Sequence, residues 1–179
     1  MKACGKCGGE ARMQPISRYQ VRKELVGGMH VELIDVVHNL VCESCGVVLR
    51  TDIPNLPGLI AAVAIGRSKA DRKLGGQEIR FLRKALDETG KELAEHLDVT
   101  EETVSRWEND RLAISNSVER MLRLRVCKLL RQKAPAIDWN DDEILYRLKI
   151  IPVSATPLVM TFRLVSHKRQ DQYREQKAA

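Results

Sequence analysis

Four of the five cysteines occur in two identical motifs with the pattern Cys-x-x-Cys-Gly. The motif cysteines are Cys4, Cys7, Cys42 and Cys45. Two residues between cysteines let both thiolates reach one ion from a tight turn. Gly8 and Gly46 can adopt positive φ, which turns backbone N–H groups toward the sulfurs. In a reducing compartment such pairs indicate a metal rather than disulfides. Four thiolates predict one closed, structural Zn²⁺ site without an open position for catalysis. A redox pair, or another thiophilic metal such as iron, is the alternative.

A second pattern lies in residues 89–110, TGKELAEHLDVTEETVSRWEND, which predicts two short helices joined by a tight turn. Thr89 and Glu92 form a capping box at the start of the first helix. Asp98 and Val99 supply the turn, and Thr100 caps the second helix. Asp98 occupies a position that usually holds glycine, and aspartate tolerates the left-handed conformation better than most residues.

Both predicted helices have one apolar face. The residues expected to point inward are Leu93, Ala94, Leu97, Val104 and Trp107. An ordinary αα-hairpin needs only these apolar residues and is the alternative interpretation. The full order of residues is more restrictive, and it favours a repressor-type helix-turn-helix whose second helix enters a DNA groove.

Polar residues on the outer face are the candidates for DNA contact. Lys91, Thr100 and Thr103 suit phosphates, and Arg106 suits bidentate pairing with guanine. Glu101 or Glu102 can accept from cytosine N4, or can simply stabilise the start of the helix. The complete predicted set is Lys91, Thr100, Glu101, Glu102, Thr103, Ser105, Arg106 and Asn109. We expect Trp107 in the core rather than stacked on a base.

The composition is compatible with a polyanionic partner but does not require one. The net charge is +6. The length of 179 residues allows one or two domains. We expect no signal peptide, and the apolar run at 59–65 is too short to span a bilayer, so a cytoplasmic protein is predicted. We do not expect an enzyme, because the sequence has no phosphate loop, nucleophile elbow or open metal site.

These motifs predict an α+β protein whose first unit, residues 1–50, is a zinc-binding β domain. Its strands are expected at 19–25 and 30–41, separated by Gly27 and Gly28, with a short strand at 47–49. A unit this small cannot fold on apolar burial alone, so the metal should supply much of its stability. His30 and His38 lie between the two motifs and are expected to be solvated or locally paired rather than metal ligands.

Residues 51–76 are predicted to be a connector with a short apolar helix at 59–65 and a flexible linker at 67–76. An all-α helix-turn-helix domain should follow at 77–133. Ser115 or Ser117 caps its last helix, which has Met121 and Leu129 among its regularly spaced apolar residues. That helix also carries a basic face, expected to be solvated or to contact phosphates. Cys127 is expected to be a buried thiol. Residues 134–179 form a C-terminal extension, partly β or disordered, with β character at 158–165 and a frayed tail at 167–179.

The order of the two cysteine motifs, a connector, the sequence LGGQEIRFLRKAL and the helix-turn-helix resembles the MqsA/YgiT family over residues 1–133. These are zinc-finger and helix-turn-helix proteins, many of them antitoxins of type II toxin–antitoxin modules. The resemblance implies zinc on the four motif cysteines, a homodimer on a palindromic operator in double-stranded DNA, and repression of the protein's own operon. It also implies a zinc domain that holds a cognate toxin. Arg106 matches a base-reading arginine of the family, whereas Glu102 stands where the family has an asparagine, so a different operator is expected. A stand-alone regulator whose zinc domain or tail binds another protein is the alternative.

Overall fold

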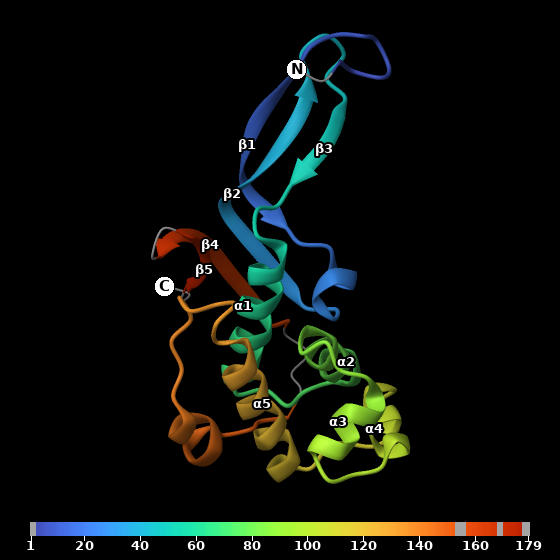
Figure 1. Ribbon diagram of the computed structural model, residues 1–179, viewed down its shortest axis with the longest axis vertical. Coiled ribbons are helices and arrows are strands. Elements are labelled where there is room, and N and C mark those ends of the chain that lie inside the picture. Colours follow the sequence, from blue (N-terminus) through green and yellow to red (C-terminus); the bar gives the residue numbers. More distant parts are fainter. Residues whose placement is uncertain (1–2, 153–156, 168–169, 177–179) are drawn as a thin grey trace.

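A long hairpin arm forms the N-terminal part of the protein (Figure 1). The computed structural model describes residues 3–152, 157–167 and 170–176. Strand β1 (Ala11–Gln20) pairs antiparallel with β2 (His30–Cys42), and β3 (Val48–Asp52) pairs antiparallel with β2. The predicted hairpin is therefore present, but its first strand begins earlier than residue 19. A 3₁₀ turn, η1 (Lys23–Val26), occupies much of the segment expected to be strand.

The C-terminal strands complete the same sheet. Strand β4 (Val159–His167) pairs parallel with β2, and β5 (Gln170–Gln176) pairs antiparallel with β4. The resulting five-stranded sheet has the order β1-β2-β4-β5, with β3 also paired to β2. The β character expected at 158–165 is confirmed, but β5 lies where a frayed tail was predicted; residues 168–169 and 177–179 of that tail are outside the described residues. Segments 1–50 and 134–179 thus share one sheet instead of forming separate units.

Helix α1 (Leu56–Lys69) is the centre of the fold. It is longer than the predicted helix at 59–65, because Asn55 caps it by accepting from the Gly58 N–H at 3.1 Å and Pro57 suits a first turn. All residues from Ala61 to Ser68 are buried. A helix with apolar residues around most of its circumference must be surrounded, and here other segments of the chain cover it.

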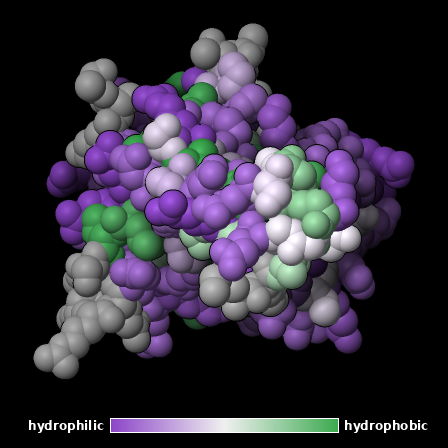
Figure 2. Space-filling view, turned by 90° about the horizontal axis from the view of Figure 1, so that it is seen from above, coloured by the Kyte–Doolittle hydropathy of each residue, from purple (hydrophilic) through white to green (hydrophobic). Residues whose placement is uncertain are grey.

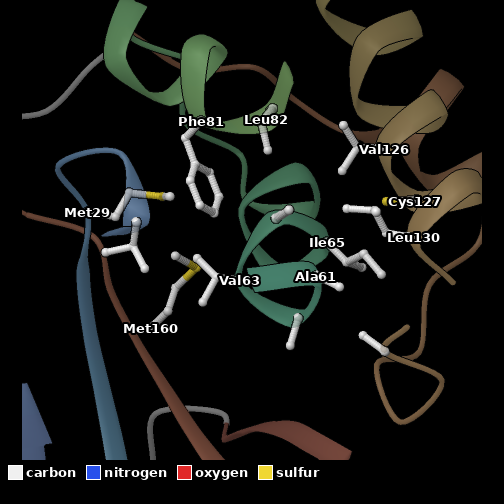
Figure 3. Close-up of a cluster of buried hydrophobic side chains, with 14 of the residues drawn as sticks. Met29, Ala61, Val63, Ile65, Phe81, Leu82, Val126, Cys127, Leu130 and Met160 are labelled. Atoms are coloured by element: carbon white, nitrogen blue, oxygen red, sulfur yellow. The ribbon is translucent and has the colours of Figure 1, made fainter. Parts of the chain in front are cut away.

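Side chains from three directions cover α1 (Figure 3). Met29, which directly precedes β2, and Met160 of β4 approach from one side, while Phe81 and Leu82 approach from α2 (Gly76–Ala85). The third group is Val126, Cys127 and Leu130 of α5 (Asn116–Leu130). One continuous core therefore draws on the predicted zinc unit, connector, helical domain and C-terminal extension.

The remaining helices are α3 (Gly90–His96), α4 (Glu101–Glu108) and a short π-helix, η2 (Glu143–Arg147). Ser115, rather than Ser117, caps α5 by accepting from the Val118 N–H at 3.3 Å. Met121 and Leu129 share the apolar spacing of α5 but are 49% and 52% exposed, so they lie outside the packed stripe.

Two buried arginines hold residues 67–76, which were predicted to be a flexible linker. Arg67 forms a bidentate pair with Glu78, with nitrogen–oxygen distances of 2.5 and 2.9 Å, and also donates to the carbonyl of Arg72. Arg123 pairs with Glu119 at 2.6 Å and donates to carbonyls of this segment. The linker prediction is wrong, because the polar composition reflects buried partners rather than solvent. Arg123 likewise departs from the solvated basic face predicted for the last helix.

Candidate metal centre and candidate nucleic-acid interface

The four motif cysteines meet at the tip of the arm. Their sulfurs all lie within 4.8 Å of one another, with Cys4 Sγ 3.8 Å from Cys45 Sγ and Cys7 Sγ 3.4 Å from Cys42 Sγ. Sulfurs bound about 2.3 Å from a tetrahedral zinc ion would be about 3.8 Å apart. The residues therefore fit a four-thiolate metal site, and among the described residues the cluster contains only cysteine ligands.

Two matching backbone turns shape this centre. Gly8 has φ of 73° and donates to the Cys4 carbonyl at 2.8 Å; Gly46 has φ of 69° and donates to the Cys42 carbonyl at 2.9 Å. The backbone N–H of Cys45 lowers the pKa of the Cys42 thiol to about 6. Because the thiolate is the form that binds metal, this turn favours ligation. Cys4 and Cys42 are buried, whereas Cys7 and Cys45 are exposed.

The other cysteine and the two candidate histidines lie elsewhere. Cys127 is buried in the core, and burial raises the pKa of its thiol to about 12, as expected for an unreactive core thiol. His30 begins β2 and lies opposite Val159 of β4 in the sheet, and His38 lies opposite Asp52 of β3. Neither belongs to the cysteine cluster.

Helices α3 and α4 have the predicted helix-turn-helix caps. The Thr89 N–H donates to Glu92 at 2.7 Å, and the Glu92 N–H donates to the Thr89 hydroxyl at 3.2 Å. Asp98 adopts φ of 54° at the turn. The Thr103 N–H then donates to the Thr100 hydroxyl at 3.1 Å, which caps α4. The five residues expected to point inward are all buried.

Most of the predicted DNA-contacting residues are exposed. Thr103 is half-buried, and the exposed members are Lys91, Thr100, Glu101, Glu102, Ser105, Arg106 and Asn109. Arg106 donates to Glu102 at 2.6 Å, and Lys91 lies 4.0 Å from Glu95. Asn109 ends α4: its amide donates to the Ser105 carbonyl at 2.7 Å and its oxygen accepts from Arg80 at 3.3 Å. Its polar atoms therefore already have partners within the protein.

An ion-pair cluster fixes α4 against α2. Arg83 forms a bidentate pair with Glu108 at 2.6 and 2.9 Å, and Arg80 adds a contact to Glu108 at 3.1 Å. Burial alone would raise the pKa of Glu108, but the two arginines lower it below its ordinary value. The backbones of the two helices also approach closely at Gly76 of α2. A Cβ there would lie 2.6 Å from the Glu108 carbonyl oxygen, so a larger residue would push the helices apart. Sequence reasoning missed these positioning residues, because nothing local pairs Arg80 and Arg83 with a carboxylate in another helix.

The two candidate sites lie at opposite ends of the molecule (Figure 1). In the view from above, hydrophilic residues cover most of the surface and the hydrophobic residues form separate small patches (Figure 2). Among the described residues, no helix is long and apolar enough to cross a membrane. No family model, curated protein or solved structure matches the chain.

Proposed function

We propose that this protein is a sequence-specific DNA-binding transcriptional repressor with a structural zinc ion at the tip of its arm. The observation that carries the proposal is the α3–turn–α4 unit. Its caps, its Asp98 turn and its inward Val104 and Trp107 leave Glu102, Ser105 and Arg106 on one exposed side of the second helix. This is the arrangement in which a recognition helix presents its side chains to base edges.

The charge of the unit needs a physical explanation, because DNA repels carboxylates. Between residues 87 and 111, acidic residues outnumber basic ones by nine to three. Six of the nine have structural roles in caps, tight turns or ion pairs with other helices. These six are Asp87, Glu88, Glu92, Asp98, Glu108 and Asp110. Basic residues of neighbouring helices balance part of this charge, so the sequence count overstates the repulsion that DNA would meet.

Hydroxyl groups at the start of α4 support phosphate contact. The Thr100 oxygen accepts from the Thr103 N–H, and the Thr100 and Thr103 hydroxyls lie 2.9 Å apart. One hydroxyl proton of this pair therefore remains available to donate outward. Lys91 is exposed and only loosely associated with Glu95, so it can exchange that partner for a phosphate at little cost.

Zinc is the metal that the arm suits best. Four thiolates at tetrahedral spacing leave no position for water or substrate, which is typical of a structural ion. Iron is the remaining alternative, and elemental analysis of purified protein distinguishes the two. This centre supports a role in stabilising the arm, and no feature of it supports zinc catalysis.

DNA selection is the direct test. Full-length, metal-loaded protein is incubated with a random duplex library, and the enriched sequences are then compared with scrambled duplexes in gel shifts over a salt series. We expect at least a thousandfold preference for the enriched sequence and a loss of that preference in Arg106→Ala. Arg12→Ala removes the same charge from a 77% exposed side chain on the arm and should change little. Equal binding to enriched and scrambled duplexes would refute the function.

The antitoxin role and the homodimer follow from the family resemblance and remain predictions. Two half-sites about 34–36 Å apart are expected for a dimeric helix-turn-helix protein, so the enriched sequence should be palindromic. With α1 enclosed, the half-exposed Met121 and Leu129 of α5 are better placed for a dimer contact. Co-purification with the product of the neighbouring gene tests for a toxin; a stable complex would favour the antitoxin over a stand-alone regulator.

A further inference from the structure

The outer face of α4 carries an exposed ion pair that the fold does not need. Arg106 Nη2 donates to Glu102 Oε1 at 2.6 Å, and the two side chains are 55% and 73% exposed. Exposed pairs four residues apart stabilise a helix only slightly. Within the part of the chain that the structure describes, neither side chain bonds to another element, in contrast to Glu108 of the same helix, which binds Arg80 and Arg83.

A carboxylate at this position is unfavourable for general DNA affinity, because its charge would be repelled by the phosphates and it neutralises Arg106. The arrangement is informative when it is compared with base edges. In the major groove a G·C pair presents two acceptors, guanine N7 and O6, followed by one donor, the N4 amino group of cytosine. The side chains present the complementary pattern, because the donors of Arg106 lie directly beside the acceptor of Glu102.

We propose that Glu102 and Arg106 read one G·C base pair as a unit, an inference that rests on the proposed DNA-binding function. Arg106 donates to guanine N7 and O6, while Glu102 accepts from N4 of the paired cytosine. Glu102 acts mainly by exclusion. At an A·T pair its carboxylate meets thymine O4, which is another acceptor, and a buried acceptor without a donor is unfavourable.

The neighbouring carboxylate, Glu101, is the competing candidate acceptor and provides a matched comparison. Glu101 is also exposed, and among the described residues it forms no ion pair. Glu101→Gln and Glu102→Gln therefore remove the same charge from the same turn of α4, but only the second changes the group beside Arg106. Glutamine can donate as well as accept, so it should tolerate thymine O4.

The experiment measures dissociation constants of full-length, metal-loaded protein for the duplex that it selects, at one fixed salt concentration. Each base pair is replaced in turn, with wild type, Glu101→Gln and Glu102→Gln compared. For wild type we expect one G·C position at which A·T weakens binding about tenfold or more. Glu102→Gln should lower that factor about threefold, because Arg106 alone still distinguishes guanine from adenine. A loss of the same size in Glu101→Gln would assign the acceptor to the neighbouring residue and overturn the proposal. A 7-deazaguanine at this position, which lacks N7, should weaken binding by all three proteins.

The outcomes separate this inference from the proposed function. Specific binding in which both glutamine variants change every duplex by the same factor would overturn the paired reader and leave the repressor standing. Absence of any sequence preference in wild type would overturn both. Thermal melting checks that neither variant has lost its fold. We expect both to melt close to wild type, because the outer face of α4 contributes little to packing.

Discussion

Two arginine–glutamate pairs in this protein have the same spacing and the same length but opposite environments. Arg123–Glu119 and Arg106–Glu102 are both four residues apart with nitrogen–oxygen distances of 2.6 Å. The first pair is fully buried, while the side chains of the second are more than half exposed. Replacing each arginine by methionine removes the charge and keeps much of the side-chain volume. The comparison therefore isolates the effect of burial.

Arg123→Met should be far more destabilising than Arg106→Met. Removing one partner of a buried pair costs about 3–5 kcal/mol, whereas an exposed pair four residues apart contributes about 0.3–0.5 kcal/mol. Arg123→Met also removes the Arg123 donor from the carbonyls of Ser68 and Ala70, and one of the two arginine donors from the Arg72 carbonyl. For a chain of this size each kcal/mol lowers Tm by about 2–4 °C, so a loss of roughly 6–20 °C is expected.

Thermal melting and amide hydrogen exchange test this reasoning together. Residues 70–74 should exchange faster in Arg123→Met, including Leu74, whose N–H donates to Glu119 at 3.0 Å. The double variant Arg123→Met, Glu119→Leu removes both charges and should recover part of the lost stability. If the two single variants melt within about 2 °C of each other, residues 67–76 are not held in the way described here.

Three further outcomes follow from the fold. Gly27 has φ of 63°, and a Cβ there would lie 2.4 Å from the Phe81 Cβ, whereas Gly8 has φ of 73° and open space around it. Gly8→Ala should therefore lower the free energy of unfolding by about 1–2 kcal/mol through backbone strain alone. Gly27→Ala should lower it by about 1–3 kcal/mol more through overpacking, and urea unfolding measures both. Because the pKa of Glu108 is lowered in the folded protein, its ionisation stabilises the fold above the unfolded carboxyl pKa near 4.3, and this contribution is lost as pH falls through the folded pKa. Glu108→Gln should therefore make the free energy of unfolding less dependent on pH in the acid range. An unchanged pH dependence would contradict this role of Glu108. Chelation should release one metal ion per chain and raise the rate of amide hydrogen exchange first at the arm. If exchange in α1 rises equally, the metal supports the whole fold instead.

The two short helices α3 and α4 and the turn between them were predictable because their determinants are local. Thr89 and Glu92 are three residues apart, and Thr100 bonds to Thr103 within the same turn. The two cysteine motifs are also local patterns, and their meeting required only that a hairpin bring its ends together. In each case the residue type and the short spacing contain most of the physical information.

The parts that sequence reasoning missed depend on distant partners. Arg67 looks like a linker residue until its carboxylate partner, Glu78, is known, and Arg123 looks like a surface arginine until its bonds to residues 68–72 are known. The parallel pairing of β2 with β4 cannot be deduced from either strand alone. Periodicity shows that a segment is apolar on one side, but it does not identify the segment that covers it.

The pairing of β2 with β4 also sets an order of events during synthesis. Cys45 completes the four-cysteine cluster early, whereas Phe162 and Tyr173, both fully buried, are made only after the whole helical region has followed it. At about 5–20 residues per second, β5 is finished about 7–26 s after Cys45. During that interval the nascent chain can already bring its four cysteines together while α1 still exposes the surface that β4 and β5 later cover. Assembly of the cysteine cluster and closure of the core are therefore separate steps, and in the time between them α1 is accessible to chaperones and proteases.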